Sequence, residues 1–121
     1  MKEEVKKWWK LAKKDLDAAD YNFKGKKYYV TIFLCEQAVE KAFKALWLKE
    51  KKSEIPKIHN LLFFLRELKV PQSFKTTCED LTGAYITSRY SADIESKFSK
   101  IDTKSLLKNS KEILKWTKKK L

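Results

Sequence analysis

The fold is decided by residues 27–51, which read KYYVTIFLCEQAVEKAFKALWLKEK. Six apolar residues recur there at spacings of three and four and form one helical stripe: Tyr28, Ile32, Cys35, Val39, Ala42 and Leu46. Four aromatic residues widen that stripe: Tyr29, Phe33, Phe43 and Trp47. At about 100° per residue the apolar arc covers roughly half of the helix. Such a helix needs cover from more than one neighbour, so it is predicted to be the central helix of a bundle or part of a dimer interface.

The segment before this helix has the same period. Residues 2–24 carry a stripe that predicts a first helix: Val5, Trp8, Trp9, Ala12, Leu16, Ala19 and Phe23. Gly25 follows at the position where a helix terminator is expected.

Three further helices are predicted after the central one, over about residues 57–68, 73–89 and 103–120. Pro56 allows the first of these to begin at residue 57 or 58, with Ile58 on its inner face. Residues 90–101 have no clean period and are predicted to form a loop, after which Asp102 or Thr103 caps the last helix. The chain is therefore predicted to be one all-α domain over residues 1–121, an up-and-down four-helix bundle with an additional short helix.

The net charge of +12 and the pI of about 9.6 favour an anionic partner, such as nucleic acid, nucleotide phosphates or an acidic protein face. Only Arg66 and Arg89 among the 28 basic residues are arginines. A lysine-rich surface also arises from adaptation to heat or from selection for solubility. The charge alone leaves both interpretations open.

The two cysteines, Cys35 and Cys78, form no CxxC motif, and no signal-peptide pattern precedes them. We therefore expect free thiols in a reducing, cytoplasmic compartment. The longest apolar run, residues 28–35, is far shorter than the ~20 residues that cross a bilayer, so no membrane association is expected.

Polar residues interrupt the apolar arc of the central helix, and their side chains need hydrogen-bonding or charged partners. Glu36 and Glu40 fall at the edge of its apolar arc, where an unpaired carboxylate is costly. We expect Arg89 to form an ion pair with one of them inside the bundle, because its planar fork suits a carboxylate. In the alternative interpretation both glutamates are solvated and Glu40 makes an i,i+4 pair with Lys44.

His59 is the only histidine, and a histidine is the usual general base near neutral pH. It is a candidate for catalysis, although a lone histidine at a helix start is more often structural. No metal site is expected, because zinc needs more ligands than one histidine supplies. The two glycines are isolated, so no phosphate-gripping loop and no cofactor site are recognised.

Taken together, these residues resemble the HEPN family (higher eukaryotes and prokaryotes nucleotide-binding). Trp9, Ala12, Asp15, Leu16 and Ala19 match its opening aromatic and Ala-x-x-Asp-Leu-x-x-Ala, and a tyrosine follows the first turn at position 28 or 29. Residues 37–45, QAVEKAFKA, are similar to its Gln-Ala-x-Glu-Lys-x-x-Lys-Ala signature. Residues 59–61, HNL, stand for Thr-His-Asp-Leu, and Leu81, Tyr85 and residues 88–90, SRY, match its late Leu…Tyr-x-x-x-Arg-Tyr element.

The resemblance implies a bundle that is often dimeric and that associates with nucleotides or with a minimal nucleotidyltransferase encoded as a separate chain. Many members are toxin ribonucleases with Arg-x(4–6)-His late in the chain. That motif is absent, because both arginines follow His59. Ser91 and Ala92 also replace the Pro-Asp that commonly follows Arg-Tyr.

Three functions follow as hypotheses. The first is a non-catalytic, dimeric module in the sense the family implies, which binds a nucleotide or RNA, or a nucleotidyltransferase, through these residues: Gln37, Lys41, Lys44, Tyr85, Arg89 and Tyr90. The second is a ribonuclease of a toxin–antitoxin system, with His59 and either Arg89 or Glu40 in a non-standard site. The third is an antitoxin-like or structural protein whose wide apolar helix forms a homodimer.

Overall fold

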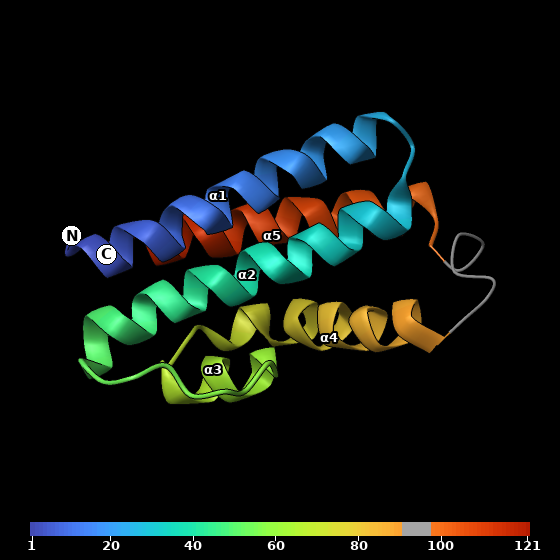
Figure 1. Ribbon diagram of the computed structural model, residues 1–121. Helices are drawn as coiled ribbons and strands as arrows, with labels where there is room; N and C mark the ends of the chain where they lie inside the picture. Colours follow the sequence, from blue (N-terminus) through green and yellow to red (C-terminus); the bar gives the residue numbers. More distant parts are fainter. Residues whose placement is uncertain (91–97) are drawn as a thin grey trace.

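The computed structural model describes the backbone of residues 1–90 and 98–121, and the side chains at all of these positions except 85 and 87–90. The described elements are α1 (Glu3–Lys24), α2 (Tyr28–Lys51), α3 (Leu61–Glu67), the 3₁₀ turn η1 (Gln72–Phe74), α4 (Lys75–Tyr90) and α5 (Lys100–Lys120). Four long helices run up and down beside one another, both termini lie at one end, and the short α3 packs at the side (Figure 1). The predicted all-α bundle is confirmed.

The central helix is α2, as its apolar arc predicts. It packs against α1, α5, α4 and α3. Eleven of its residues are buried: Thr31, Ile32, Cys35, Glu36, Ala38, Val39, Glu40, Ala42, Phe43, Ala45 and Leu46. Burial of aliphatic and aromatic side chains on three sides of one helix supplies most of the driving force for this bundle.

The pairing of α1 with α2 is the most extensive in the bundle. Both helices bury alanines completely, Ala12 and Ala19 on α1 and Ala38, Ala42 and Ala45 on α2. Small side chains allow two helix backbones to approach closely, and alanine does so without the helix-propensity cost of glycine. The alanines therefore bring the polar side chains of α2 within reach of α1.

The predicted start of the third helix, at residue 57 or 58, is wrong. The helix begins at Leu61, and Ile58 and His59 lie in the irregular segment before it. Asn60 is the N-cap: its backbone is extended, and its side-chain oxygen accepts a hydrogen bond from the Leu62 N–H at 2.9 Å. A cap that satisfies an otherwise unpaired N–H fixes the helix start more strongly than the proline four residues earlier.

The predicted cap of the last helix is also wrong. Ser99, not Asp102 or Thr103, caps α5, and its hydroxyl accepts a hydrogen bond from the Asp102 N–H at 3.0 Å. Asp102 lies in the first turn, where a carboxylate interacts favourably with the helix dipole. The predicted fourth helix is divided into η1 and α4.

Nowhere in residues 1–90 and 98–121 is there a helix that combines the length and the apolarity needed to cross a bilayer.

Candidate functional site

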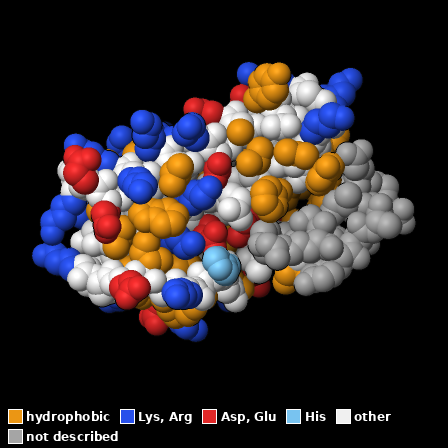
Figure 2. Space-filling view, viewed as in Figure 1, with side chains coloured by type: hydrophobic (Ala, Val, Ile, Leu, Met, Phe, Trp, Pro, Cys, Tyr) orange, Lys and Arg blue, Asp and Glu red, His pale blue; other side chains and the backbone are white. Residues whose placement is uncertain are grey.

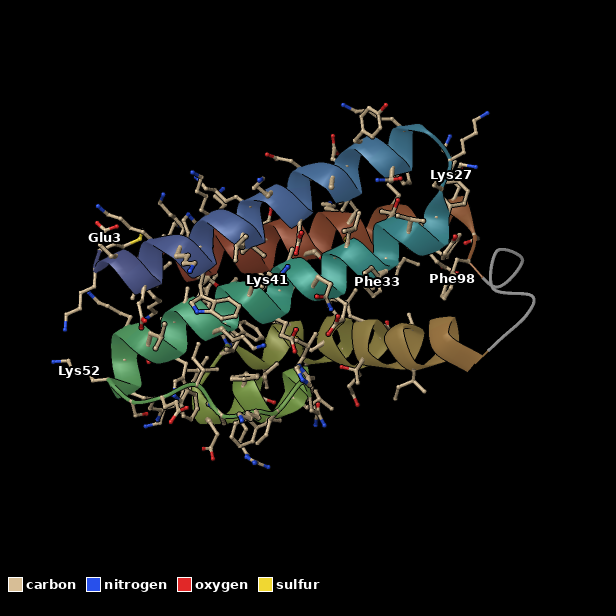
Figure 3. All side chains as sticks on the ribbon, in the orientation of Figure 1. Glu3, Lys27, Phe33, Lys41, Lys52 and Phe98 are labelled. Carbon is tan, nitrogen blue, oxygen red and sulfur yellow. The ribbon has the colours of Figure 1, made fainter. Side chains whose placement is uncertain are left out.

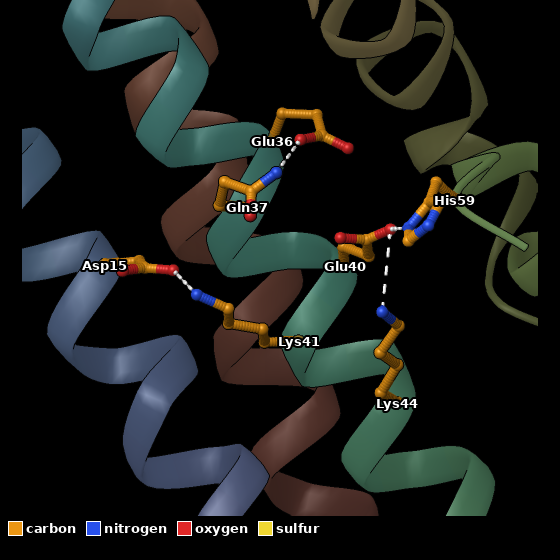
Figure 4. Close-up of polar contacts among 7 residues, drawn as sticks. All are labelled: Asp15, Glu36, Gln37, Glu40, Lys41, Lys44 and His59. Carbon is orange, nitrogen blue, oxygen red and sulfur yellow. Dashed lines mark hydrogen bonds and ion pairs between the residues drawn. The ribbon is translucent and has the colours of Figure 1, made fainter. Parts of the chain in front are cut away.

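Five buried or half-buried polar side chains form a strip along α2, which we call the α2 polar strip: Glu36, Gln37, Glu40, Lys41 and Lys44. Figure 4 shows these residues between α1 and the segment that leads into α3. Glu36 and Glu40 are only 2% and 4% exposed, so the prediction that both are solvated is wrong, whereas the i,i+4 pair of Glu40 with Lys44 in that interpretation is confirmed. The Gln37 amide donates a hydrogen bond to Glu36 Oε2 at 2.7 Å.

The Glu40 carboxylate is the hub of the strip. Its Oε1 lies 2.8 Å from His59 Nδ1 and 3.8 Å from Lys44 Nζ (Figure 4). The carboxylate has only acceptors, so the imidazole donates its Nδ1–H to Glu40. The His59 side chain is 71% exposed while that of Glu40 is 6% exposed. A buried acid therefore orients an imidazole that reaches the surface, as the space-filling view shows (Figure 2).

Lys44 is held between an acid and an aromatic ring. Its side chain is 12% exposed, and its ammonium lies 5.2 Å from the centre of the Trp8 ring on α1. A cation above an indole face is attracted by the ring quadrupole. The stem of Lys44 is thus fixed, and its charge is placed next to His59 through their shared partner Glu40.

Lys41 is paired across the bundle. Its ammonium lies 2.5 Å from Asp15 Oδ2 on α1, and the two side chains are 24% and 21% exposed. Figure 3 shows Lys41 projecting from α2 towards α1. The sequence predicted a ligand contact for Lys41 and no partner role for Asp15. A signal was present, because Asp15 stands at helical spacing between Ala12 and Ala19 on the buried stripe.

The predicted ion pair of Arg89 with Glu36 or Glu40 lies outside the described residues, as do the side chains of Tyr85 and Tyr90. Their roles stay predictions. Of the predicted ligand-binding residues, the structure brings Gln37, Lys41 and Lys44 together on one edge of α2.

This arrangement supports two kinds of chemistry. Lys44 is a hydrogen-bond donor beside His59, whose outer ring nitrogen accepts a hydrogen bond when the ring is neutral and donates one to an anionic group when the ring is protonated. An imidazole oriented by a carboxylate is also the arrangement used in general acid–base catalysis. Within residues 1–90 and 98–121, no three His, Cys, Asp or Glu side chains gather as a metal-binding group.

Comparison with known families identifies the architecture. The HEPN domain model matches residues 5–121. The chain belongs to the HEPN family. Among solved structures, TT1696 from Thermus thermophilus superposes with a TM-score of 0.88 at 22% sequence identity, covering 99% of this chain and 100% of that chain. ST0689, described as an archaeal HEPN homologue, superposes with a TM-score of 0.81 at 27% identity, covering 98% and 97%. No curated protein matches the sequence.

The HEPN signature residues have clear physical roles in this fold. Asp15 of the opening motif and Lys41 of the α2 motif are the two ends of one ion pair. Glu40 of the α2 motif meets His59 of the motif before α3. Two polar contacts thus tie α1 and the segment before α3 to the central helix.

Proposed function

We propose that this HEPN protein is a non-catalytic binding module. Its ligand is a nucleotide or RNA phosphate, held at the end of the α2 polar strip where Lys44 lies near the exposed His59 imidazole. The observation that carries the proposal is the 2.8 Å contact between the exposed His59 imidazole and the buried Glu40, with Lys44 beside it. The Lys44 ammonium and the His59 ring, which donates from its outer nitrogen when protonated, are positioned before a ligand arrives, and this lowers the entropy cost of binding.

Both lysines of the strip have an acidic partner, but Lys41 is hydrogen-bonded to Asp15 on α1, whereas Lys44 lies 3.8 Å from Glu40 on the side of His59. Lys44 therefore supplies the phosphate charge in this proposal. The proposed ligand site is completed by Gln37, Arg89, Tyr85 and Tyr90. An amide and a guanidinium donate hydrogen bonds, and tyrosine rings stack on bases. Lys41 acts by holding α2 against α1 rather than by touching the ligand.

Titration calorimetry with a panel of ribonucleotides tests the proposal. We expect the Lys44→Ala variant to bind about tenfold more weakly than the wild type, because a charge-assisted contact with phosphate is lost. Lys49→Ala is the matched control, since Lys49 is an exposed residue near the end of the same helix. Equal binding by the wild type and Lys44→Ala contradicts the proposal, and so does absence of heat at about 1 mM nucleotide.

A homodimer is the second part of the proposal. Phe33 on α2 and Ile86 on α4 are among the large apolar side chains left exposed, at 38% and 54%. Figure 2 shows hydrophobic side chains gathered over the first half of α2. A second copy meeting this face by twofold symmetry removes them from water.

A nucleotidyltransferase partner is the third part, and it rests on the family alone. The adjacent reading frame provides the first test, since the partner is expected to be encoded separately. Co-elution of the two chains after co-expression is the expected result, and separate elution contradicts it.

Ribonuclease activity is a second candidate function, because the geometry of His59 and Glu40 specifically favours it. With Nδ1–H bound to Glu40, the other ring nitrogen is available to take the proton from an RNA 2′-hydroxyl. That oxygen then attacks the adjacent phosphorus and the P–O5′ bond breaks, giving a 2′,3′-cyclic phosphate. The leaving 5′-oxygen becomes a hydroxyl by taking a proton from the His59 imidazolium or from water.

RNA incubated with wild type and with His59→Ala distinguishes the two functions. If the second candidate is correct, cleavage by the wild type falls at least about 100-fold in His59→Ala, the usual contribution of a general base. Cleavage at equal rates by both proteins, or by neither, eliminates the ribonuclease.

A further inference from the structure

A groove runs between α1 and α5, which lie side by side in opposite directions (Figure 1). One hollow of about 350 Å³ has Trp9, Leu16 and Leu114 among its lining residues. A second hollow of about 440 Å³ continues it, sharing Leu16, Asp17 and Lys111. The groove is separate from the α2 polar strip, and its function does not depend on the proposed nucleotide site.

The rim of this groove is strongly basic. Lys13 stands on the α1 side, and Lys111, Lys115 and Lys118 stand on the α5 side, against a single carboxylate in the first hollow, Asp17. Lys13 and Lys115 make no ion pair with any described residue. The groove therefore combines an apolar floor with unneutralised positive charge on both sides.

Trp9, one of the lining residues, carries a buried donor without an acceptor in the described part of the chain. It is 6% exposed, and its indole N–H is buried with no acceptor among the described residues. The Lys118 ammonium lies 5.5 Å from the centre of its ring. A buried donor without an acceptor costs free energy, so an oxygen that reached it on binding would be favoured.

The length of the groove suits a short helix. It extends along α1 from Trp9 to Tyr21, a rise of about 18 Å at 1.5 Å per residue, which a helix of about 12 residues matches. At the far end the lining consists of Asp17, Asp20, Tyr21 and Lys24 on α1 and Lys111 on α5. Asp20 is ion-paired with both lysines there, and Tyr21 is 78% exposed.

These features favour a peptide over a nucleic acid. The Trp9 ring is buried and Lys118 lies over it, so it cannot stack on a base. An aliphatic floor between lysines instead fits an aliphatic side chain flanked by carboxylates. We propose that the α1–α5 groove binds an acidic amphipathic helix of a partner protein. The aliphatic face of that helix packs on Leu16 and Leu114, and its carboxylates contact the lysines of the rim.

A fluorescein-labelled peptide of about 12 residues, with leucines on one helical face and glutamates elsewhere, is the probe. The scrambled peptide of the same composition and a single-stranded oligouridylate of the same length are the comparison ligands. The groove variant is Lys115→Glu with Lys118→Glu. The control variant is Lys104→Glu with Lys119→Glu, which makes the same charge change at exposed positions of α5 outside the groove.

We expect the patterned peptide to bind the wild type and the control variant with similar anisotropy titrations, and the groove variant about tenfold more weakly. The indole N–H signal of Trp9 in ¹⁵N-labelled protein, assigned by Trp9→Phe, should shift on binding. Circular dichroism melting of both variants establishes that they are folded before the titrations are compared.

Four outcomes overturn the proposal. The patterned peptide does not bind at about 1 mM. The scrambled peptide binds as tightly, or the control variant loses as much affinity, so that only overall charge matters. The oligouridylate binds more tightly than the peptide and loses affinity in the groove variant, which makes this a nucleic-acid surface. The groove variant changes the oligomeric state of the free protein, which assigns the groove to a second copy of the chain.

Discussion

Glu40 shows at the residue scale how a charge is tolerated inside this bundle. Its side chain is 6% exposed, yet it contacts the imidazole of His59 and the ammonium of Lys44. An isolated buried carboxylate is strongly unfavourable, and two cationic or donor groups offset that cost. A buried carboxylate that orients an exposed imidazole suggests a ligand-binding site. The carboxylate contributes little to ligand binding by itself, but it sets the direction of the ring.

The two thiols give a pH-dependent prediction. Burial raises the pKa of Cys35 from 9.0 to about 11 and that of Cys78 to about 12. Above pH 9 the thiols ionise in the unfolded chain but stay protonated in the folded protein, so the unfolded state binds fewer protons and stability falls as pH rises. At pH 10 the loss is about 1 kcal/mol for each thiol relative to pH 8.

Urea unfolding at pH 8 and pH 10 measures this loss, with Cys35→Ala/Cys78→Ala as the reference. The wild type should lose more free energy of unfolding than the double variant over that interval, since lysines titrate equally in both proteins. Equal losses in the two proteins would show that the thiols ionise as readily in the fold as outside it.

At the scale of elements, the pairing of α1 with α2 combines alanine packing with one ion pair. The alanines set a short distance between the helices, and Asp15 and Lys41 meet across that interface at 2.5 Å. Because these side chains are partly buried, their attraction is screened less than that of a surface pair. The ion pair therefore fixes the register of α1 along α2.

A double-mutant cycle measures that contact. We expect a coupling energy of about 1 kcal/mol between Asp15→Ala and Lys41→Ala, above the few tenths typical of exposed pairs. The cycle Glu3→Ala with Lys6→Ala is the matched control, because that pair is solvent-exposed at 3.9 Å. A coupling energy for Asp15 and Lys41 no larger than that of the control would contradict a role in fixing the register.

At the scale of the whole molecule, the exposed apolar side chains over α2 and the net charge of +12 act in opposite directions on self-association. Like charges keep copies apart, whereas burial of an aromatic side chain brings them together. At physiological salt the repulsion between two copies is screened beyond about 8 Å, so the proposed dimer is expected to form through the apolar contact.

Sedimentation equilibrium at micromolar concentration tests the homodimer. The wild type should have twice the 14.4 kDa mass of the chain, and Phe33→Asp should be monomeric, because a carboxylate cannot be buried there without a partner. Tyr21→Asp, at another exposed aromatic residue on α1, should remain dimeric. A monomeric wild type, or a dimeric Phe33→Asp, excludes this face as the interface.

The sequence by itself determined the helices, because hydrophobic periodicity is a local property of the chain. It also determined the central place of α2, because a broad apolar arc needs several neighbouring helices to cover it. It also placed Glu36 and Glu40 at that buried edge. Helix starts at Leu61 and Lys100 were misjudged, since several residues near each end can cap and only the folded geometry selects Asn60 and Ser99.

Only the tertiary structure decided which polar residues meet. Lys41 pairs with Asp15, 26 positions away, and Glu40 with His59, 19 positions away, so the contacts of the α2 polar strip join three separate segments. The basic groove between α1 and α5 likewise joins opposite ends of the chain. Periodicity determines which face of a helix turns inward, but the partner that a charge finds depends on how close the packing of neighbouring helices brings it.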